Sequence, residues 1–118
     1  MVIVLCNAPP ADAERIARAL VDARLAACVN VIAGVVSVYR WKGETVCEPE
    51  STLIIKSRPE LLERLRETLE SVHPYEVPEI VALRVNPDDV NASYLGWLRG
   101  ELPDAPLGHE AHKTPIKN

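Results

Sequence analysis

The hydrophobic residues of this chain change their spacing several times, and the order of these changes restricts the fold more than any other feature. A short apolar run, residues 2–6, precedes a stretch with helical spacing and then a long β-branched stretch, residues 28–56. A second helical stretch and a second apolar run, residues 80–85, follow. Because Lys42 and Gly43 offer a left-handed turn, the long stretch divides into two strands, 28–41 and 44–56. The resulting order predicts an α+β domain with the split βαβ arrangement.

Two stretches have the three- and four-residue spacing of amphipathic helices. The first has Asp12 as a candidate N-cap, and the second begins at Ser57 and Glu60, which match the Ser-x-x-Glu capping box. Their apolar residues are Ile16, Ala19, Leu20 and Ala23 in the first, and Leu62, Leu65, Leu69 and Val72 in the second. A short final helix is indicated by Tyr94, Leu95 and Leu98.

The predicted sheet has helices on one face, so its other face needs a cover. The long hairpin also exceeds what the remaining strands can pair, and Pro49 within it indicates either an edge position or a bulge. Self-association as a closed homo-oligomer is the common remedy for such a face. We therefore expect a homo-oligomer in which the end of the hairpin pairs with a neighbouring subunit.

The segment HPYEVPEI, residues 73–80, joins the second helix to the last strand. Pro74 and Pro78 fix their own φ angles and keep His73 and Val77 out of helical geometry, so the segment forms a stiff corner. It carries an imidazole, a phenol and two carboxylates. Rigid connections of this kind often carry function, although a packed connection with a capping histidine is an equally good interpretation.

Composition excludes several classes of protein. The chain has 118 residues, a net charge of -4 and no dense basic segment, which argues against nucleic-acid and anionic-membrane partners. No apolar run reaches membrane-spanning length, and the opening residues lack the pattern of a signal peptide. Three cysteines without a CxxC pair suit a reducing compartment. We expect a cytoplasmic protein.

Four segments resemble the signature segments of the CutA family, the divalent-cation tolerance proteins. They are LAACVN at 25–30, SVYRWKGE at 37–44, HPYEVPEI at 73–80 and YLGWL at 94–98. The resemblance implies a ferredoxin-like subunit over residues 1–102, a compact homotrimer in the cytoplasm, and a role in tolerance of copper and other divalent cations. Residues 103–118, with three prolines and the pair His109 and His112, lie outside it and are expected to form a flexible or partner-covering tail.

The resemblance also implies a metal site. The family's ligands correspond to Cys6, Val72 and His73, so one family histidine is replaced here by valine. Thiolate and imidazole both suit copper, and the remaining pair of Cys6 and His73 predicts weak binding. A buried free thiol is the alternative interpretation of Cys6, because cysteine is among the most buried residue types.

A ligand cleft is the competing hypothesis. We expect Tyr39, Trp41 and Lys42 from the hairpin, with Glu76 and Glu79 from the corner, to line it. Packing between subunits is the alternative role of Tyr39 and Trp41, and it is the more common one for such residues. A small-molecule-binding signalling trimer of the PII type and an enzyme with a cleft between subunits are the two alternative functions. No nucleophile elbow, phosphate-binding loop or catalytic dyad is visible, so we expect no enzyme.

Overall fold

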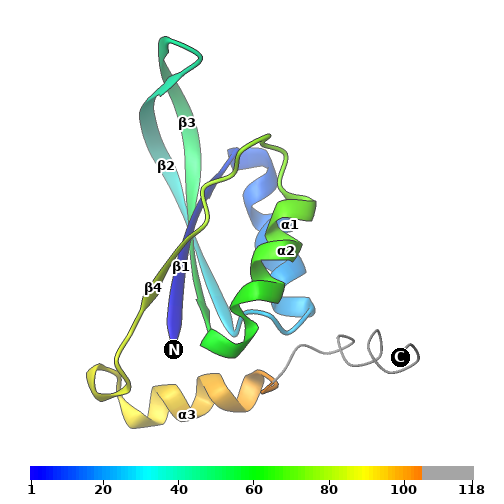
Figure 1. Cartoon of the computed structure of the whole chain (residues 1–118), viewed down its shortest axis with the longest axis vertical. Helices are drawn as coiled ribbons and strands as arrows, with labels where there is room; N and C mark the ends of the chain where they lie inside the picture. The colour runs from blue at the N-terminus through cyan, green and yellow to red at the C-terminus, as the bar shows by residue number, and fades with distance from the viewer. Residues whose placement is uncertain (105–118) are drawn as a thin grey trace, which may run out of the picture.

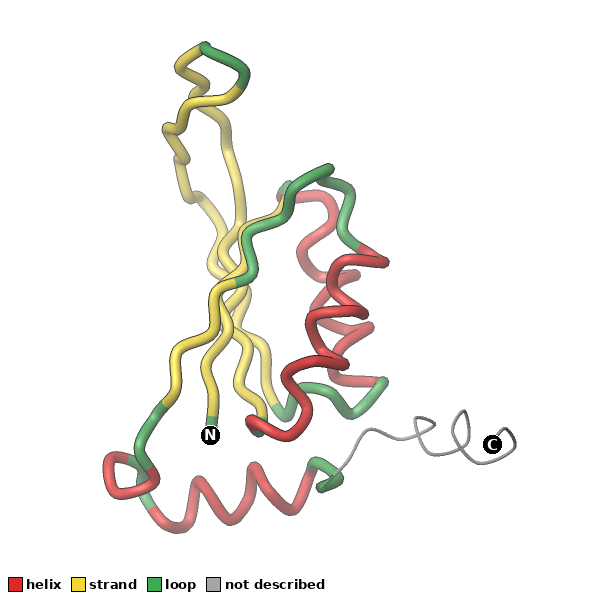
Figure 2. Tube along the Cα trace, viewed as in Figure 1, coloured by secondary structure: helices red, strands yellow, loops and turns green. Residues whose placement is uncertain are grey.

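The computed structural model describes residues 1–104 of the chain. Its strands are β1 (Val2–Ala8), β2 (Cys28–Trp41), β3 (Glu44–Ser57) and β4 (Val81–Arg84). Its helices are α1 (Pro10–Asp22), α2 (Leu62–Val72) and α3 (Ala92–Glu101), with 3-10 turns at Pro59–Leu61 and Pro87–Asp89. The predicted order of elements is confirmed, and Figure 2 shows that the corner between α2 and β4 is a loop.

The four strands form one antiparallel sheet in the order β2-β3-β1-β4. Helices α1 and α2 cover one face of this sheet, and the end of the β2-β3 hairpin projects beyond both helices (Figure 1). This is the split βαβ arrangement of the ferredoxin-like fold, as the order of spacings predicts. The longest helix within residues 1–104, α1, has 13 residues, and no described helix is long and apolar enough to cross a membrane.

The core lies between the sheet and the two covering helices. Alternate residues of β1, from Val2 through Val4 and Cys6 to Ala8, are buried on the helix side. They pack against Ile16, Leu20, Leu65 and Leu69 of the helices. Each fully buried leucine contributes about 1.5–3 kcal/mol relative to an exposed one, so the apolar stripes of the helices determine on which face they dock.

Both helix starts differ from the sequence prediction. The N-cap of α1 is Pro9 without a side-chain cap, and the Asp12 carboxylate instead pairs with Arg15 at 2.9 Å. Ser57 is still part of β3 and faces the core, where its hydroxyl donates to the Leu25 carbonyl at 2.6 Å. The predicted capping box is therefore wrong. The Ser57 hydroxyl makes a tertiary hydrogen bond to the Leu25 carbonyl and does not cap the helix.

A β-bulge in β2 decides which hairpin side chains face the open side of the sheet. Ile32 pairs with Thr52 and Val35 pairs with Glu50, so β2 holds one more residue than β3 between these pairs. Gly34 in the bulge has φ +80°, a left-handed conformation. Beyond the bulge, Ser37, Tyr39 and Trp41 share the open face. Pro49 lies in β3 beyond the residues that β1 pairs, which confirms the edge alternative.

We expect Gly34→Ala to lower the free energy of unfolding by about 1–2 kcal/mol, because an L-residue strains at this φ. A Cβ at Gly34 would have nothing within 4 Å, so backbone conformation alone accounts for the cost. Gly96→Ala is the matched control: Gly96 is helical with equally open surroundings, and this change should stabilise the protein. Urea denaturation of the three proteins measures both effects. Destabilisation by both changes would contradict the explanation.

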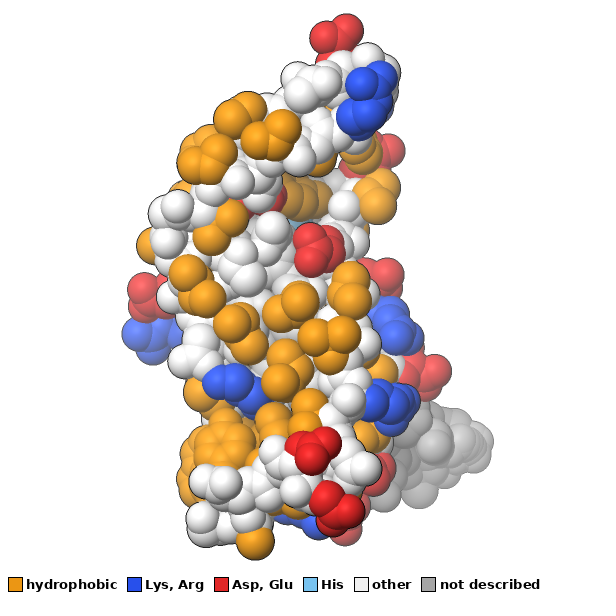
Figure 3. All heavy atoms as spheres, turned by 90° about the vertical axis from the view of Figure 1, so that its left-hand side faces the viewer, with side chains coloured by type: hydrophobic (Ala, Val, Ile, Leu, Met, Phe, Trp, Pro, Cys, Tyr) orange, Lys and Arg blue, Asp and Glu red, His pale blue; other side chains and the backbone are white. Residues whose placement is uncertain are grey.

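The open face of the sheet is apolar at its centre. Cross-strand pairing places six large side chains on this face: Ile3, Leu5, Ile32, Ile54, Val81 and Leu83. Figure 3 views the molecule from this side and shows hydrophobic side chains gathered across the middle of the surface. Three of these residues, Ile32, Val81 and Leu83, are more than two-fifths exposed in the single chain. The prediction of an apolar sheet face without a cover is thus confirmed for the single chain.

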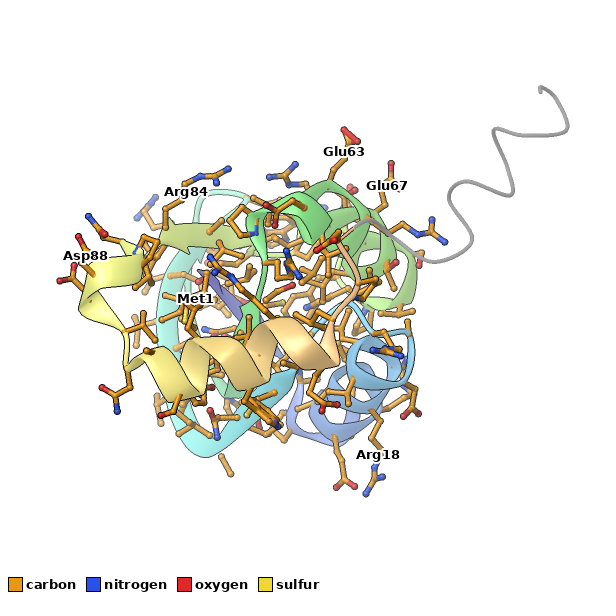
Figure 4. All side chains as sticks on the ribbon, turned by 90° about the horizontal axis from the view of Figure 1, so that it is seen from below. Met1, Arg18, Glu63, Glu67, Arg84 and Asp88 are labelled. Carbon is orange, nitrogen blue, oxygen red and sulfur yellow. The ribbon has the colours of Figure 1, made fainter. Side chains whose placement is uncertain are left out.

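Helix α3 crosses the end of the sheet beside Met1 (Figures 1 and 4). Arg58 holds this end together, because its guanidinium contacts the carbonyls of Arg99 and Leu102 and the carboxylate of Asp104 at 2.7 Å. Leu102 is buried. The predicted boundary between residues 1–102 and the tail 103–118 stays a prediction, and His109 and His112 lie outside the described residues.

Candidate functional site

A cleft of about 680 Å³ lies between the projecting hairpin and the corner. The hairpin lines it with side chains that the bulge turns to the open face, including Ser37, Tyr39, Trp41, Glu48 and Glu50. The corner lines the other side with Tyr75, Glu76, Val77 and Glu79. Asn7, near the end of β1, is a further lining residue. Four carboxylates therefore surround one cavity, and no Lys, Arg or His side chain of residues 1–104 lines it.

Glu50 ties the corner to the hairpin. Its side chain is only 5% exposed, and its two carboxylate oxygens accept hydrogen bonds from the Tyr75 hydroxyl at 2.5 Å and the Asn7 amide at 3.2 Å. Thr52 in turn donates to the Asn7 side-chain oxygen at 2.8 Å. A buried carboxylate needs such donors, since leaving it unsatisfied costs several kcal/mol. The network positions Tyr75 in the wall of the cleft.

A second tyrosine–carboxylate pair lies on the hairpin itself. The Tyr39 hydroxyl donates to Glu48 at 2.6 Å, and this hydrogen bond raises the pKa of Tyr39 to about 12. Burial and the hydrogen bond to Glu50 raise the pKa of Tyr75 as well. Both phenols therefore stay protonated at neutral pH and act as donors, which leaves Glu76 and Glu79 as the cleft carboxylates without a hydrogen bond or ion pair within residues 1–104.

His73 lies behind the cleft wall, 8% exposed. Its Nδ1 accepts a hydrogen bond from the Tyr75 backbone N–H at 3.1 Å, so Nε2 carries the proton and donates to the Asn7 carbonyl at 2.8 Å. The Tyr75 ring lies against the imidazole, with centroids 4.8 Å apart. Both ring nitrogens are thus engaged, and a metal on either one would replace an existing hydrogen bond.

Cys6 is fully buried on the helix side of β1. Burial, with smaller contributions from the charges of Glu79 and Glu50, raises the pKa of its thiol to about 12. The Cys6 sulfur and His73 Nε2 both contact the carbonyl oxygen of Asn7, at 3.7 Å and 2.8 Å. The structure therefore brings the Cys6 sulfur and His73 Nε2, the two predicted metal ligands, to one backbone oxygen. The raised pKa keeps the Cys6 thiol protonated at neutral pH. Among residues 1–104, no group of three His, Cys, Asp or Glu side chains is arranged to hold a metal ion.

All but one of the predicted cleft residues line the same cavity. Tyr39, Trp41, Glu76 and Glu79 line the cavity, whereas Lys42 lies at the turn with its ammonium 5.7 Å from the centroid of the Trp41 ring. Sequence reasoning missed Glu48, Glu50 and Tyr75. Alternation along β3 puts both glutamates on one face, but only the hydrogen bond from Tyr75 to Glu50 shows that this face meets the corner.

The fold and cleft define a ferredoxin-like domain with an open apolar sheet face and an acidic cavity beside its hairpin. Residues 2–101 match the sequence model of the CutA1 divalent ion tolerance protein family. A divalent-cation tolerance protein CutA from Thermus thermophilus is 46% identical over 98 residues, which cover 82% of this chain and 93% of the relative. The chain belongs to the CutA1 divalent ion tolerance family.

Solved structures agree with this assignment. The PII-like protein CutA from Nostoc in its apo form matches with a TM-score of 0.83 and 42% identity, covering 87% of this chain and 98% of the other. The Thermus thermophilus protein matches with a TM-score of 0.81 and 44% identity, covering 87% and 100%. Human Protein CutA is 46% identical over 87 residues, and the match spans only 48% of its length and 74% of this chain. The chain thus spans nearly all of the bacterial relative but about half of the human one.

Proposed function

We propose that this chain acts in divalent-cation tolerance by drawing cations into the acidic cleft and holding copper weakly at Cys6 and His73. The observation that carries the proposal is the lining of the cleft, with four carboxylates and no cationic side chain among the described residues. A cleft of one charge sign focuses its field and raises the local concentration of counter-ions. The names of the relatives connect the family with divalent ions.

Copper ligation requires changes at both proposed ligands. The Cys6 thiol would lose its proton, and His73 would give up one of its two hydrogen bonds. Each change costs free energy that the metal must offset, and Val72 supplies no third donor. We therefore propose weak binding that tightens as pH rises, because the metal competes with the thiol proton.

We further propose that the protein is a cytoplasmic homotrimer. The apolar centre of the open sheet face and the unpaired β2 edge of the projecting hairpin supply the surface, and a closed ring is the assembly that covers it on every subunit. Cys6, Cys28 and Cys47 are free thiols, which suits a reducing compartment. The matched relatives carry names of tolerance or PII-like proteins rather than of enzymes, and we propose no catalytic activity for this chain.

Copper titration tests the metal site. We expect Cys6→Ala and His73→Ala each to weaken Cu²⁺ binding by at least about tenfold, the scale on which metal sites respond to loss of a supporting group. Cys47→Ala is the matched control, because Cys47 is an exposed free thiol that does not line the cleft, and its loss should leave the affinity of the Cys6 and His73 site unchanged. Isothermal titration at pH 6 and pH 8 also measures the predicted tightening. Equal affinity in all four proteins would remove Cys6 and His73 from the site.

A further inference from the structure

The acidic cleft is too large and too dispersed for a single bare ion. It encloses about 680 Å³, and the described residues contain no group of three acidic, His or Cys side chains arranged around one point. Its carboxylates instead occupy opposite walls, with Glu48 and Glu50 on the hairpin and Glu76 and Glu79 on the corner. Glu48 and Glu50 already accept hydrogen bonds from phenols, so Glu76 and Glu79 are the two carboxylates left for a ligand that carries more than one cationic group.

Aromatic and aliphatic surface fills the space between the carboxylates. Tyr39, Trp41 and Tyr75 line the cleft together with Val38, Val46 and Val77. Two of the rings are held in place, since the Tyr39 and Tyr75 hydroxyls donate to Glu48 and Glu50. Aromatic faces attract ammonium groups, and they pack equally well against methylene chains.

The structure itself shows a cation on one of these rings. The Lys42 ammonium lies 5.7 Å from the centroid of the Trp41 ring, within the range of a cation–π interaction. This is an alkyl ammonium supplied by the chain, and it contacts an aromatic residue of the cleft. The contact shows that the Trp41 ring can lie beside an alkyl ammonium group.

We propose that the cleft binds linear aliphatic polyamines, with ammonium groups paired to Glu76 and Glu79 and the methylene chain against Tyr39, Tyr75 and Trp41. Glu76 and Glu79 are the acceptors because neither has a hydrogen bond or ion pair within residues 1–104, while Glu48 and Glu50 are engaged by phenols. The inference uses the cleft on which the proposed function rests, but its contacts exclude Cys6 and His73.

Isothermal titration of the full-length protein in its assembled state, at low ionic strength, tests the proposal with spermidine, 1,4-diaminobutane, butylamine and Mg²⁺. We expect the diamine to bind at least about tenfold more tightly than butylamine, because a second charge-assisted hydrogen bond forms. Mg²⁺ at equal concentration should compete weakly, since it carries the charge without the methylene chain. High salt should weaken spermidine binding, because salt screens exposed charges.

The deciding comparison is between two double variants with the same change in net charge. Glu76→Gln with Glu79→Gln should weaken spermidine binding by at least about tenfold. Glu63→Gln with Glu67→Gln alters exposed carboxylates of α2 that point away from the domain in Figure 4, and this variant should bind as the wild type does. Size exclusion verifies that both variants assemble.

The outcomes separate this inference from the proposed function. Undetectable spermidine binding, equal loss in both double variants, or butylamine binding as tightly as the diamine would overturn the polyamine proposal and leave the copper site standing. Spermidine binding that depends on Glu76 and Glu79, together with copper affinity unaffected by Cys6→Ala and His73→Ala, would support the polyamine proposal and remove the metal site.

Discussion

Leu83→Arg should convert the protein from the proposed trimer to a monomer and lower its thermal stability sharply. Leu83 is 48% exposed in the single chain, so an arginine there costs the isolated subunit little. It lies on β4 opposite Ile3, within the apolar open face. In the proposed trimer this face is covered, and an unpaired buried charge costs about 3–5 kcal/mol. A closed trimer would bury this arginine in all three subunits, so the cost would apply three times.

Val21→Arg provides the matched control. Val21 is 40% exposed, a similar fraction, but it lies on the outer side of α1, away from the open sheet face. The same change of side chain should leave the trimer intact there. Light scattering coupled to size exclusion measures the mass of each protein, and unfolding followed at two protein concentrations tests whether stability depends on assembly. A wild-type monomer at micromolar concentration, or a trimeric Leu83→Arg variant, would refute the assembly.

The order and type of the elements could be predicted because each one buries a single stripe or face. Alternation in β1 and the leucines at positions 62, 65 and 69 of α2 point to the same core, so local spacing and tertiary packing agree. Helix starts were predicted less well. Ser57 can cap a helix or satisfy a loop carbonyl, and only the packed structure shows that the Leu25 carbonyl takes its hydroxyl.

The candidate site was predictable in its segments but not in its contacts. The two prolines of the corner identified Glu76 and Glu79, and both line the cleft. The bulge at Gly34 could not be located from alternation, although it decides that Ser37, Tyr39 and Trp41 share the open face of the sheet. Glu50 was missed because a glutamate in a strand is usually exposed, and its burial depends on donors from Tyr75 and Asn7, which are distant in sequence.

Tyr75→Phe should lower the free energy of unfolding at pH 7 by about 1.5–3 kcal/mol, the range for hydrogen bonds to charged groups. The change removes the hydroxyl that donates to Glu50 at 2.5 Å and leaves a carboxylate that is 5% exposed with one side-chain donor, Asn7. Tyr39→Phe is the matched control, since it deletes a hydroxyl that donates to Glu48 in an exposed pair. Exposed pairs of this kind contribute little, so the control should unfold nearly as the wild type does.

Alkaline pH should reduce the difference between wild type and Tyr75→Phe. Burial and the hydrogen bond to Glu50 raise the pKa of Tyr75 above its ordinary value of 10.0. The protonated phenol is therefore favoured in the folded state, and its contribution to stability is complete below pH 10. Above pH 10 the unfolded chain loses this proton first, so the contribution declines as pH rises toward the folded pKa. Urea denaturation at pH 8 and pH 10.5 measures both differences. A gap between wild type and Tyr75→Phe that stays constant or widens at pH 10.5 would show that the Tyr75 hydroxyl does not stabilise the fold through this protonated hydrogen bond.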